Sequence, residues 1–312
     1  MQTEIGGYLE LERFSGSLFH EGALALGSGR ACLRWLLRQR GIRKIALPDF
    51  LCDVVEETCR DTEVLYYPVA EDLRPAELPE DGDCWVYLVN YYGQLTGEEI
   101  LAAAERHPKL IVDNAQAYFA PALPGIDTIY TCRKFLGVAD GAFLYTDAPQ
   151  VPLERDESHT RMGFVLGRFE RPAGDFFAEA SENNERLSSE PLRMSALTEN
   201  LLRAVDYESV KRRRSGNFRR LHAALGEANL LSLRETEGAY AYPLLLRAGT
   251  EVRRKLIEKK IFVPTLWPNV LEDRHAGETA RHLARDILPL PCDQRYGPEE
   301  MDYIIQSVRE NL

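Results

Sequence analysis

The sequence predicts an α/β protein with a mainly parallel sheet covered by helices on both faces. Short and almost continuous apolar runs, such as residues 85–89, alternate with segments of helical length in the first half of the chain. Strands of a parallel sheet are buried on both faces, so they form continuous rather than alternating apolar runs. The chain has 312 residues, which suits one large domain and a smaller one.

The first half of the chain contains six expected strands and three expected helices. The strands are 44–48, 63–67, 85–89, 110–112, 127–130 and 142–145. The helices span about 29–40, 51–60 and 97–107. Thr96 and Glu99 form a capping-box pattern that supports the start of the third helix.

The second half is less regular. The apolar pattern is lost over residues 151–190, and the polar stretch 179–189 is expected to be a mobile or partner-contacting loop. A long helical segment is expected over about 194–226, with a break near Asp206. A smaller α/β unit should then contain strands at 241–246 and 261–263 and helices at 251–260 and 298–310, the last with Pro298 in its first turn.

These elements predict a short N-terminal arm over residues 1–19, a large domain over 20–198 and a small domain over 199–312. The net charge of −11 argues against nucleic-acid binding. The basic run Lys211–Arg214, with Arg219 and Arg220, is interpreted as a solvated helix face, with an anion contact as the alternative.

No apolar run approaches the ~18 residues that span a membrane, and the N-terminal residues do not resemble a signal peptide. We therefore expect a cytoplasmic protein without membrane contacts. The six cysteines include no Cys-x-x-Cys pair, so we expect free packing thiols and no metal site.

Three segments carry candidate chemistry, each with a simpler alternative. Gly27-Ser28-Gly29-Arg30 precedes a helix, where backbone N–H groups can bind an anion or merely start the helix. Asp113 follows a strand and could hold a cationic ring nitrogen or a metal, or cap a helix. Lys134 lies between two buried strands and is either a nucleophile or a turn lysine that reaches solvent.

The order and spacing of these segments resemble the pyridoxal-phosphate (PLP) enzymes of fold type I, and more narrowly the DegT/StrS-type sugar aminotransferases. The resemblance covers nearly the whole chain and implies the fold-type-I architecture, a large mainly parallel sheet domain with a smaller C-terminal α/β domain. The matching segments are 28–33, 92–94, 112–117, 134–142, 192–197 and 288–290 followed by 298–305.

The resemblance also implies a role for each site residue. Lys134 would bind the cofactor as a Schiff base, and Asp113 would pair with its pyridinium nitrogen. Gln116 would lie near the ring hydroxyl oxygen, and residues 28–30 would hold the phosphate. Phe50 is the candidate for stacking on the ring, with core packing as the alternative.

Several positions depart from the family pattern. Ile129 stands where the family has a phosphate-binding serine, and Thr131 is the candidate for supplying the missing hydroxyl. Arg30 replaces a threonine, and its guanidinium could bind the phosphate directly. Pro191 replaces an asparagine that reaches the neighbouring subunit, and residues 139–142 replace a Gly-Glu-Gly-Gly segment.

The favoured hypothesis is a homodimeric PLP-dependent aminotransferase that transfers an amino group from an amino acid to a keto sugar, possibly nucleotide-linked. The departures leave open a PLP-dependent lyase or dehydratase, or a transaminase for a smaller substrate. A non-catalytic binding protein on the same fold is the third hypothesis, because a fold does not determine function.

Overall fold

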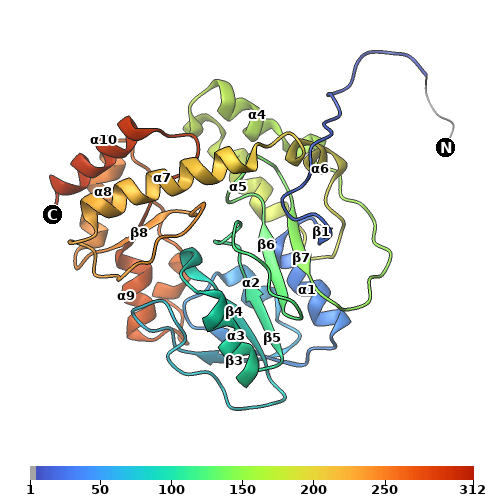
Figure 1. Ribbon diagram of the computed structural model, residues 1–312, viewed down its shortest axis with the longest axis horizontal. Coiled ribbons are helices and arrows are strands. Elements are labelled where there is room, and N and C mark those ends of the chain that lie inside the picture. Colours follow the sequence, from blue (N-terminus) through green and yellow to red (C-terminus); the bar gives the residue numbers. More distant parts are fainter. Residues whose placement is uncertain (1–4) are drawn as a thin grey trace.

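A seven-stranded sheet forms the centre of the computed structural model, which describes residues 5–312 (Figure 1). Its strand order is β1-β7-β6-β5-β4-β2-β3, and only β7 runs antiparallel to its neighbours. The mainly parallel α/β fold predicted from the sequence is therefore confirmed. The strands are β1 (Leu24–Leu26), β2 (Lys44–Pro48), β3 (Glu63–Tyr67), β4 (Trp85–Val89), β5 (Leu110–Asp113), β6 (Asp127–Thr131) and β7 (Ala142–Tyr145).

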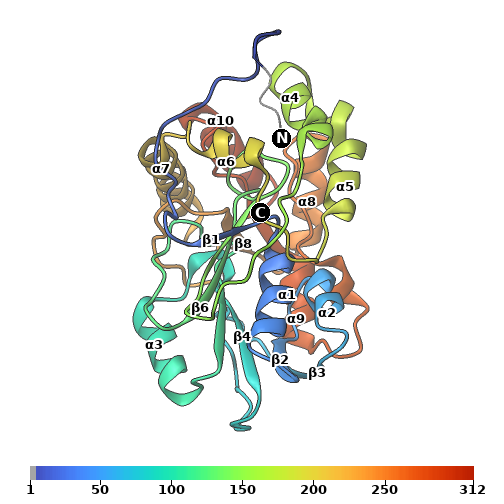
Figure 2. The same ribbon diagram turned by 90° about the vertical axis from the view of Figure 1, so that its right-hand side faces the viewer.

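Helices cover both faces of this sheet. Figure 2 shows α3 (Gly97–Arg106) on one face and α1 (Gly29–Gln39) with α2 (Asp53–Thr58) on the other. The Ser28 side chain caps α1 by accepting from the Ala31 N–H. The capping box predicted for Thr96 and Glu99 is present at the start of α3, so both of these helices begin where the sequence placed them.

The segment between the sheet and the C-terminal part differs from its prediction. Residues 179–189 are not one polar loop, because α5 (Phe177–Arg186) occupies most of this stretch. Another helix, α4 (Gly163–Glu170), precedes it, and η2 (His159–Arg161) and η3 (Ala173–Phe176) are short 3₁₀ turns. The helices bury few side chains, with only Asn183 buried in α5, so they leave no apolar period in the sequence.

The C-terminal part matches its prediction in most elements. The expected break near Asp206 separates α6 from α7, and the Asp206 side chain caps α7 by accepting from Ser209 N–H. The strand expected over 261–263 is wrong, because β8 pairs instead with β9, which was not predicted. The elements are α6 (Ala196–Leu202), α7 (Tyr207–Leu225), β8 (Tyr242–Leu245), α8 (Gly249–Glu258), η4 (Pro268–Leu271), α9 (Glu278–Asp286), β9 (Ile287–Leu290) and α10 (Pro298–Arg309).

The hydrophobic core has two large clusters and a smaller third one. The first surrounds the large sheet and also takes in Val270 and Leu283 from η4 and α9. The second lies under α7, α8 and α10 and includes Phe218, Leu244 and Leu256. The C-terminal part thus contributes side chains to the core of the sheet, and the domain boundary between 198 and 199 stays a prediction. Among the described residues, no helix has the length and apolar character needed to cross a membrane.

Candidate active site

Parallel strand pairing gathers the candidate residues at one edge of the sheet. Asp113 at the end of β5 is in register with Val89 of β4 and Ile129 of β6. The segments that follow β2, β4, β5 and β6 therefore leave the sheet on the same side. The carboxyl edge of such a sheet is where ligands bind in open α/β folds.

Asp113 is a buried carboxylate that is held by neutral donors. Its side chain accepts from the Tyr87 hydroxyl at 2.9 Å and from the Ala115 N–H at 2.8 Å, and the residue is 9% exposed. No salt bridge involves Asp113 within residues 5–312. A carboxylate can accept about four hydrogen bonds, so this one keeps capacity for a cation. The helix-cap alternative does not apply, since turns rather than a helix follow β5.

Gln116 carries a buried donor without a protein acceptor. Its Oε1 accepts from the Tyr92 N–H at 2.8 Å, and the residue is 2% exposed. Its Nε2 has no hydrogen-bond partner in the described part of the chain. Leaving a buried donor unpaired costs about 1 to 3 kcal/mol, which indicates a place for a ligand acceptor.

The start of α1 lies against β6 and is covered by the segment after α5. The Ser28 hydroxyl donates to the Ser188 carbonyl at 3.1 Å while it caps the helix. A Cβ at Gly29 would lie 3.8 Å from the Ile129 side chain, so an apolar group faces this helix end. The Ser28 side chain takes the Ala31 N–H, so the Gly29 and Arg30 N–H groups are the first-turn donors that remain suited to an anion.

The Arg30 guanidinium was expected to bind the phosphate directly, but in the structure it bonds backbone carbonyls. It donates to the Leu187 and Asn184 carbonyls, both at 3.2 Å, at the C-terminal end of α5. Arg133 donates to the Asn184 side chain, and burial together with the nearby Arg30 charge lowers the pKa of Arg133 to about 10. Both arginines thus complement the negative end of the α5 dipole. Thr131, which is 8% exposed, lies at the carboxyl end of β6.

Lys134 follows β6 and is exposed. Its Nζ lies 5.8 Å from the centre of the Tyr240 ring. It also lies close enough to Cys52 to oppose the effect of burial, which raises the pKa of that thiol. Burial therefore does not distinguish Lys134 from an ordinary turn lysine. Its position does, because it follows β6 and lies near both Cys52, in the segment after β2, and Tyr240, in the C-terminal part.

The basic run on α7 has a role that the sequence did not suggest. Arg214 is 2% exposed, and its guanidinium donates to the Phe135 carbonyl at 3.0 Å and to the Ala239 carbonyl at 2.9 Å. Its Nε donates to the Gln294 side chain at 2.7 Å. For Arg214, both the solvated-face interpretation and the anion contact are wrong, because this guanidinium clamps the loop after Lys134 to the C-terminal part.

Phe50 packs in the core, as the alternative interpretation had it. Its ring is 1% exposed and lies between Tyr91, at 5.3 Å between ring centres, and Trp267, at 4.8 Å. The stacking role predicted for Phe50 is not supported, because neighbouring aromatic rings fill the space around it. Cys52, from the same segment, is the residue that lies near Lys134.

Sequence reasoning did not assign a role to Tyr87, Tyr92 or Tyr240. Tyr87 could have been found, because a tyrosine inside a buried strand needs a partner for its hydroxyl. Tyr92 lies in the Tyr-Gly-Gln segment that resembles the family, but its contact to Gln116 runs through the backbone. Tyr240 precedes β8, and only the folded structure brings it to Lys134.

The seven-stranded sheet and the helices that cover it have the fold-type-I architecture of solved aminotransferase structures. The solved structures it resembles include a DegT DnrJ EryC1 StrS aminotransferase from Brucella abortus, with a TM-score of 0.64 and 15% identity over 93% of this chain and 86% of that one. DesV from S. venezuelae gives a TM-score of 0.63 and 18% identity over 92% and 84% of the two chains. The sugar aminotransferase CalS13 from Micromonospora echinospora gives 0.63 and 13% over 93% and 87%.

At these identities the likeness concerns the fold. The resemblance to the DegT/StrS-type aminotransferases is confirmed at that level and extends over nearly the whole chain. Neither the protein-family models nor the curated proteins give a match to this sequence.

Proposed function

We propose that this protein is a PLP-dependent aminotransferase that transfers the amino group of an amino acid to a keto sugar. In this reaction the donor becomes a keto acid, and the sugar carbonyl becomes an amine. The observation that carries the proposal is a pair of buried polar groups, close together at the end of β5, that keep unused hydrogen-bonding capacity. The Asp113 carboxylate has no cationic partner among the described residues, and the buried Gln116 Nε2 has no acceptor there.

These groups fit the cofactor by their chemistry. Asp113 would hold the proton on the ring nitrogen, and the Tyr87 hydroxyl and Ala115 N–H orient that carboxylate. Gln116 Nε2 would donate to the ring oxygen. The Gly29 and Arg30 N–H groups at the start of α1 would bind the phosphate, with Thr131 as the candidate hydroxyl. PLP supplies an electron-withdrawing ring that carries the amino group between the two substrates.

Lys134 Nζ would hold the cofactor covalently and move the proton at the substrate Cα as general acid and base. Its exposure lets an incoming amino donor reach it. The hydrogen bonds that Arg214 and Gln294 make to the Phe135 carbonyl restrict the backbone directly after this lysine. Such restraint favours a fixed position for the reacting amine.

Activity on a panel of keto sugars, including nucleotide-linked ones, tests this proposal. The protein with PLP and an amino acid donor should form an amino sugar and the matching keto acid. The Lys134→Ala variant serves as the inactive control. Absence of both products for every sugar, in a protein that binds PLP, would contradict the proposed substrate class and favour elimination or a smaller substrate.

A non-catalytic protein on the same fold is the second candidate. One observation favours it: the segment after α5 covers the start of α1, through Ser28–Ser188 and Arg30–Leu187 hydrogen bonds. A cofactor phosphate has less room there than at an open helix end. Failure of the protein to bind PLP at all would support this candidate.

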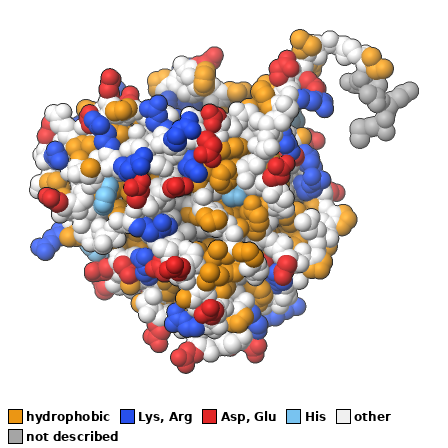
Figure 3. Space-filling model, in the orientation of Figure 1, with side chains coloured by type: hydrophobic (Ala, Val, Ile, Leu, Met, Phe, Trp, Pro, Cys, Tyr) orange, Lys and Arg blue, Asp and Glu red, His pale blue; other side chains and the backbone are white. Residues whose placement is uncertain are grey.

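We also propose a homodimer, as the resemblance implies. The N-terminal arm leaves the body of the molecule with its apolar side chains in solvent (Figure 3), and Ile5, Tyr8 and Leu9 are more than nine-tenths exposed at 96%, 99% and 92%. Phe169 on α4 is likewise 94% exposed. Apolar surface of this kind marks interaction sites. Sedimentation of a monomer at working concentration would contradict this part of the proposal. The cytoplasmic location expected from the sequence stays a prediction.

A further inference from the structure

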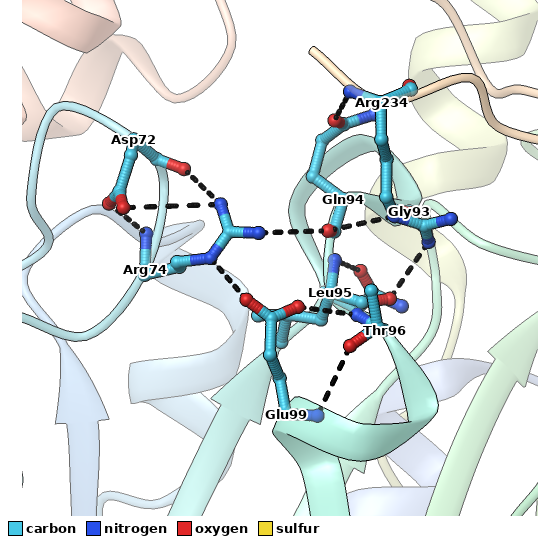
Figure 4. A network of polar contacts seen from close by, with 9 residues as sticks. Asp72, Arg74, Gly93, Gln94, Leu95, Thr96, Glu99 and Arg234 are labelled. Atoms are coloured by element: carbon cyan, nitrogen blue, oxygen red, sulfur yellow. Dashed lines mark hydrogen bonds and ion pairs between the residues drawn. The ribbon is translucent and has the colours of Figure 1, made fainter. Parts of the chain in front are cut away.

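Arg234 holds the turn that follows β4 by bonding its backbone carbonyls (Figure 4). The guanidinium donates to the Gln94 carbonyl at 3.0 Å, to the Leu95 carbonyl at 2.8 Å and to the Gly93 carbonyl. Arg234 itself belongs to the segment between α7 and β8. One side chain from the C-terminal part therefore fixes three successive peptide groups of the large sheet domain.

The Gln94 side chain closes the same contact from the other side. Its Oε1 accepts from the Arg234 N–H at 3.0 Å. Its Nε2 donates to the Thr236 hydroxyl at 2.9 Å and to the Arg234 carbonyl at 3.3 Å. Arg74 adds a weaker contact to the Gln94 carbonyl at 3.4 Å. The turn is thus held on its carbonyl groups and on its side chain at once.

The turn that these contacts hold has an unfavourable backbone conformation. Tyr92 has φ 51°, in the left-handed region, and Gly93 follows with φ 72°. A left-handed residue other than glycine costs about 1 to 2 kcal/mol and persists only where its surroundings impose it. A side chain at position 93 is also excluded, because a Cβ there would lie 2.8 Å from the Thr236 side chain.

The left-handed conformation has a consequence for the candidate site. It presents the Tyr92 N–H to Gln116 Oε1 at 2.8 Å. Because an N–H can donate only to the amide oxygen, this contact sets the orientation of the Gln116 amide group. The other end, Nε2, is then the buried donor that lacks a partner among residues 5–312.

We propose that Arg234 is a positioning residue for the candidate active site: by holding residues 93–95 it keeps Tyr92 left-handed and so aims the Gln116 Nε2 donor at a bound ligand. The inference rests on the proposed function only in naming PLP as that ligand. It assigns to the C-terminal part a direct role in shaping the binding site, through one arginine and one turn.

The test compares Arg234→Gln, Gln116→Ala and the double variant with wild type. Glutamine keeps a polar side chain but cannot bond three carbonyls. Arg219→Gln is the matched control, since Arg219 is an exposed arginine that forms a surface ion pair with Glu235 at 3.2 Å and no other within residues 5–312. Melting temperatures identify any variant that is not folded under the conditions of the assay, and Arg234→Lys then replaces Arg234→Gln.

Amide hydrogen exchange without cofactor gives the first readout. Arg234→Gln should speed exchange at least about tenfold in peptides that contain residues 91–95, since the loss of hydrogen bonds worth about 1.4 kcal/mol or more frees the turn. The control should leave these peptides unchanged. Unchanged exchange in Arg234→Gln would overturn the proposal, whether or not the protein binds PLP.

PLP titration gives the second readout. Arg234→Gln and Gln116→Ala should each raise the Kd for PLP about tenfold. Both should shift the visible band of the bound cofactor in the same direction. In the Gln116→Ala background, Arg234→Gln should change the Kd less than about twofold, because its effect passes through Gln116. Additive effects would overturn the proposal. A wild type that binds no PLP would instead remove the proposed function, and hydrogen exchange alone would then decide whether Arg234 holds the turn.

Discussion

Two buried glutamines on neighbouring turns use their amide groups in opposite ways. Gln94, after β4, bonds both ends of its side chain to Arg234 and Thr236. Gln116, after β5, bonds only its oxygen and leaves Nε2 without a partner in the described residues. Both are nearly inaccessible, at 4% and 2% exposure. The hydrogen bonds of Gln94 thus stabilise the contact with the C-terminal part, whereas Gln116 keeps a donor that the proposed function assigns to a ligand.

Arg214 is a charged side chain that, like Gln94, is fully bonded within the fold. Its replacement should have the largest effect on stability. Arg214→Ala should lower the free energy of unfolding by about 3 kcal/mol or more, because it leaves buried carbonyls of Phe135 and Ala239 unpaired. Arg213→Ala, an exposed neighbour, should change it by less than about 0.5 kcal/mol. Urea denaturation measures both, and equal losses would contradict the role assigned to the Arg214 clamp.

His20 is a buried titratable side chain that is also bonded within the fold, and its burial predicts a pH dependence of stability. Its ring is 3% exposed and Nε2 donates to the Tyr118 carbonyl at 2.9 Å, and burial lowers the pKa of His20 from 6.5 to about 4. The unfolded chain then binds a proton more readily than the folded one between these values. The free energy of unfolding should therefore fall by about 3 kcal/mol as the pH drops from 6.5 to 4. Well above pH 6.5, His20 should add nothing to the pH dependence of stability.

Unfolding free energies of wild type and His20→Gln across this pH range check the prediction. The variant should lose that part of the pH dependence. A parallel pH profile for the two proteins would show that His20 does not titrate as its burial implies.

Gln94→Ala separates the two glutamines by stability. It should lower the free energy of unfolding by about 2 kcal/mol, because Thr236 and the Arg234 backbone lose buried partners. Thermal or urea unfolding of the cofactor-free protein is the measurement. A loss no larger than that of Gln116→Ala would erase the distinction between the two residues.

Gln116→Ala should have the smallest effect on stability. It removes an unpaired buried donor, which is favourable, and leaves the Tyr92 N–H without its acceptor, which is unfavourable. The two effects nearly cancel, and the free energy of unfolding should change by no more than about 1 kcal/mol. Added PLP should nevertheless raise the melting temperature of this variant less than that of wild type. An equal PLP-dependent rise would place the ligand contact elsewhere.

The sequence was sufficient for six of the seven strands of the sheet, and only the short strand β1 was not predicted. Strands such as 85–89 are buried on both faces and so have continuous apolar runs, and Asp113 lies at a strand end by its place in the chain. The helix α5 was missed, because Asn183 is its only buried residue and no apolar period marks it. The strand β9 was missed because its pairing with β8 depends on residues far apart in the chain.

The hydrogen bonds of Arg234 and Arg30 and the packing of Phe50 could not be predicted from the sequence, because they too depend on residues far apart in the chain. Arg234 bonds main-chain carbonyls, which every residue has, so no side-chain pattern marks its partners. Arg30 likewise bonds carbonyls near the end of α5, a helix that the sequence did not predict. Phe50 was assigned to the cofactor ring because it follows a strand end, but Tyr91 and Trp267 place it in the core.

Trapping of PLP on the protein with borohydride, followed by peptide mass spectrometry, tests the central claim most directly. We expect a visible absorption band with PLP that borohydride abolishes, and one modified peptide that carries the reduced cofactor on Lys134. Lys134→Ala should show no such peptide. A wild type that binds no PLP, or that carries the cofactor on another lysine, would contradict the assignment of Lys134 and Asp113 to a PLP site.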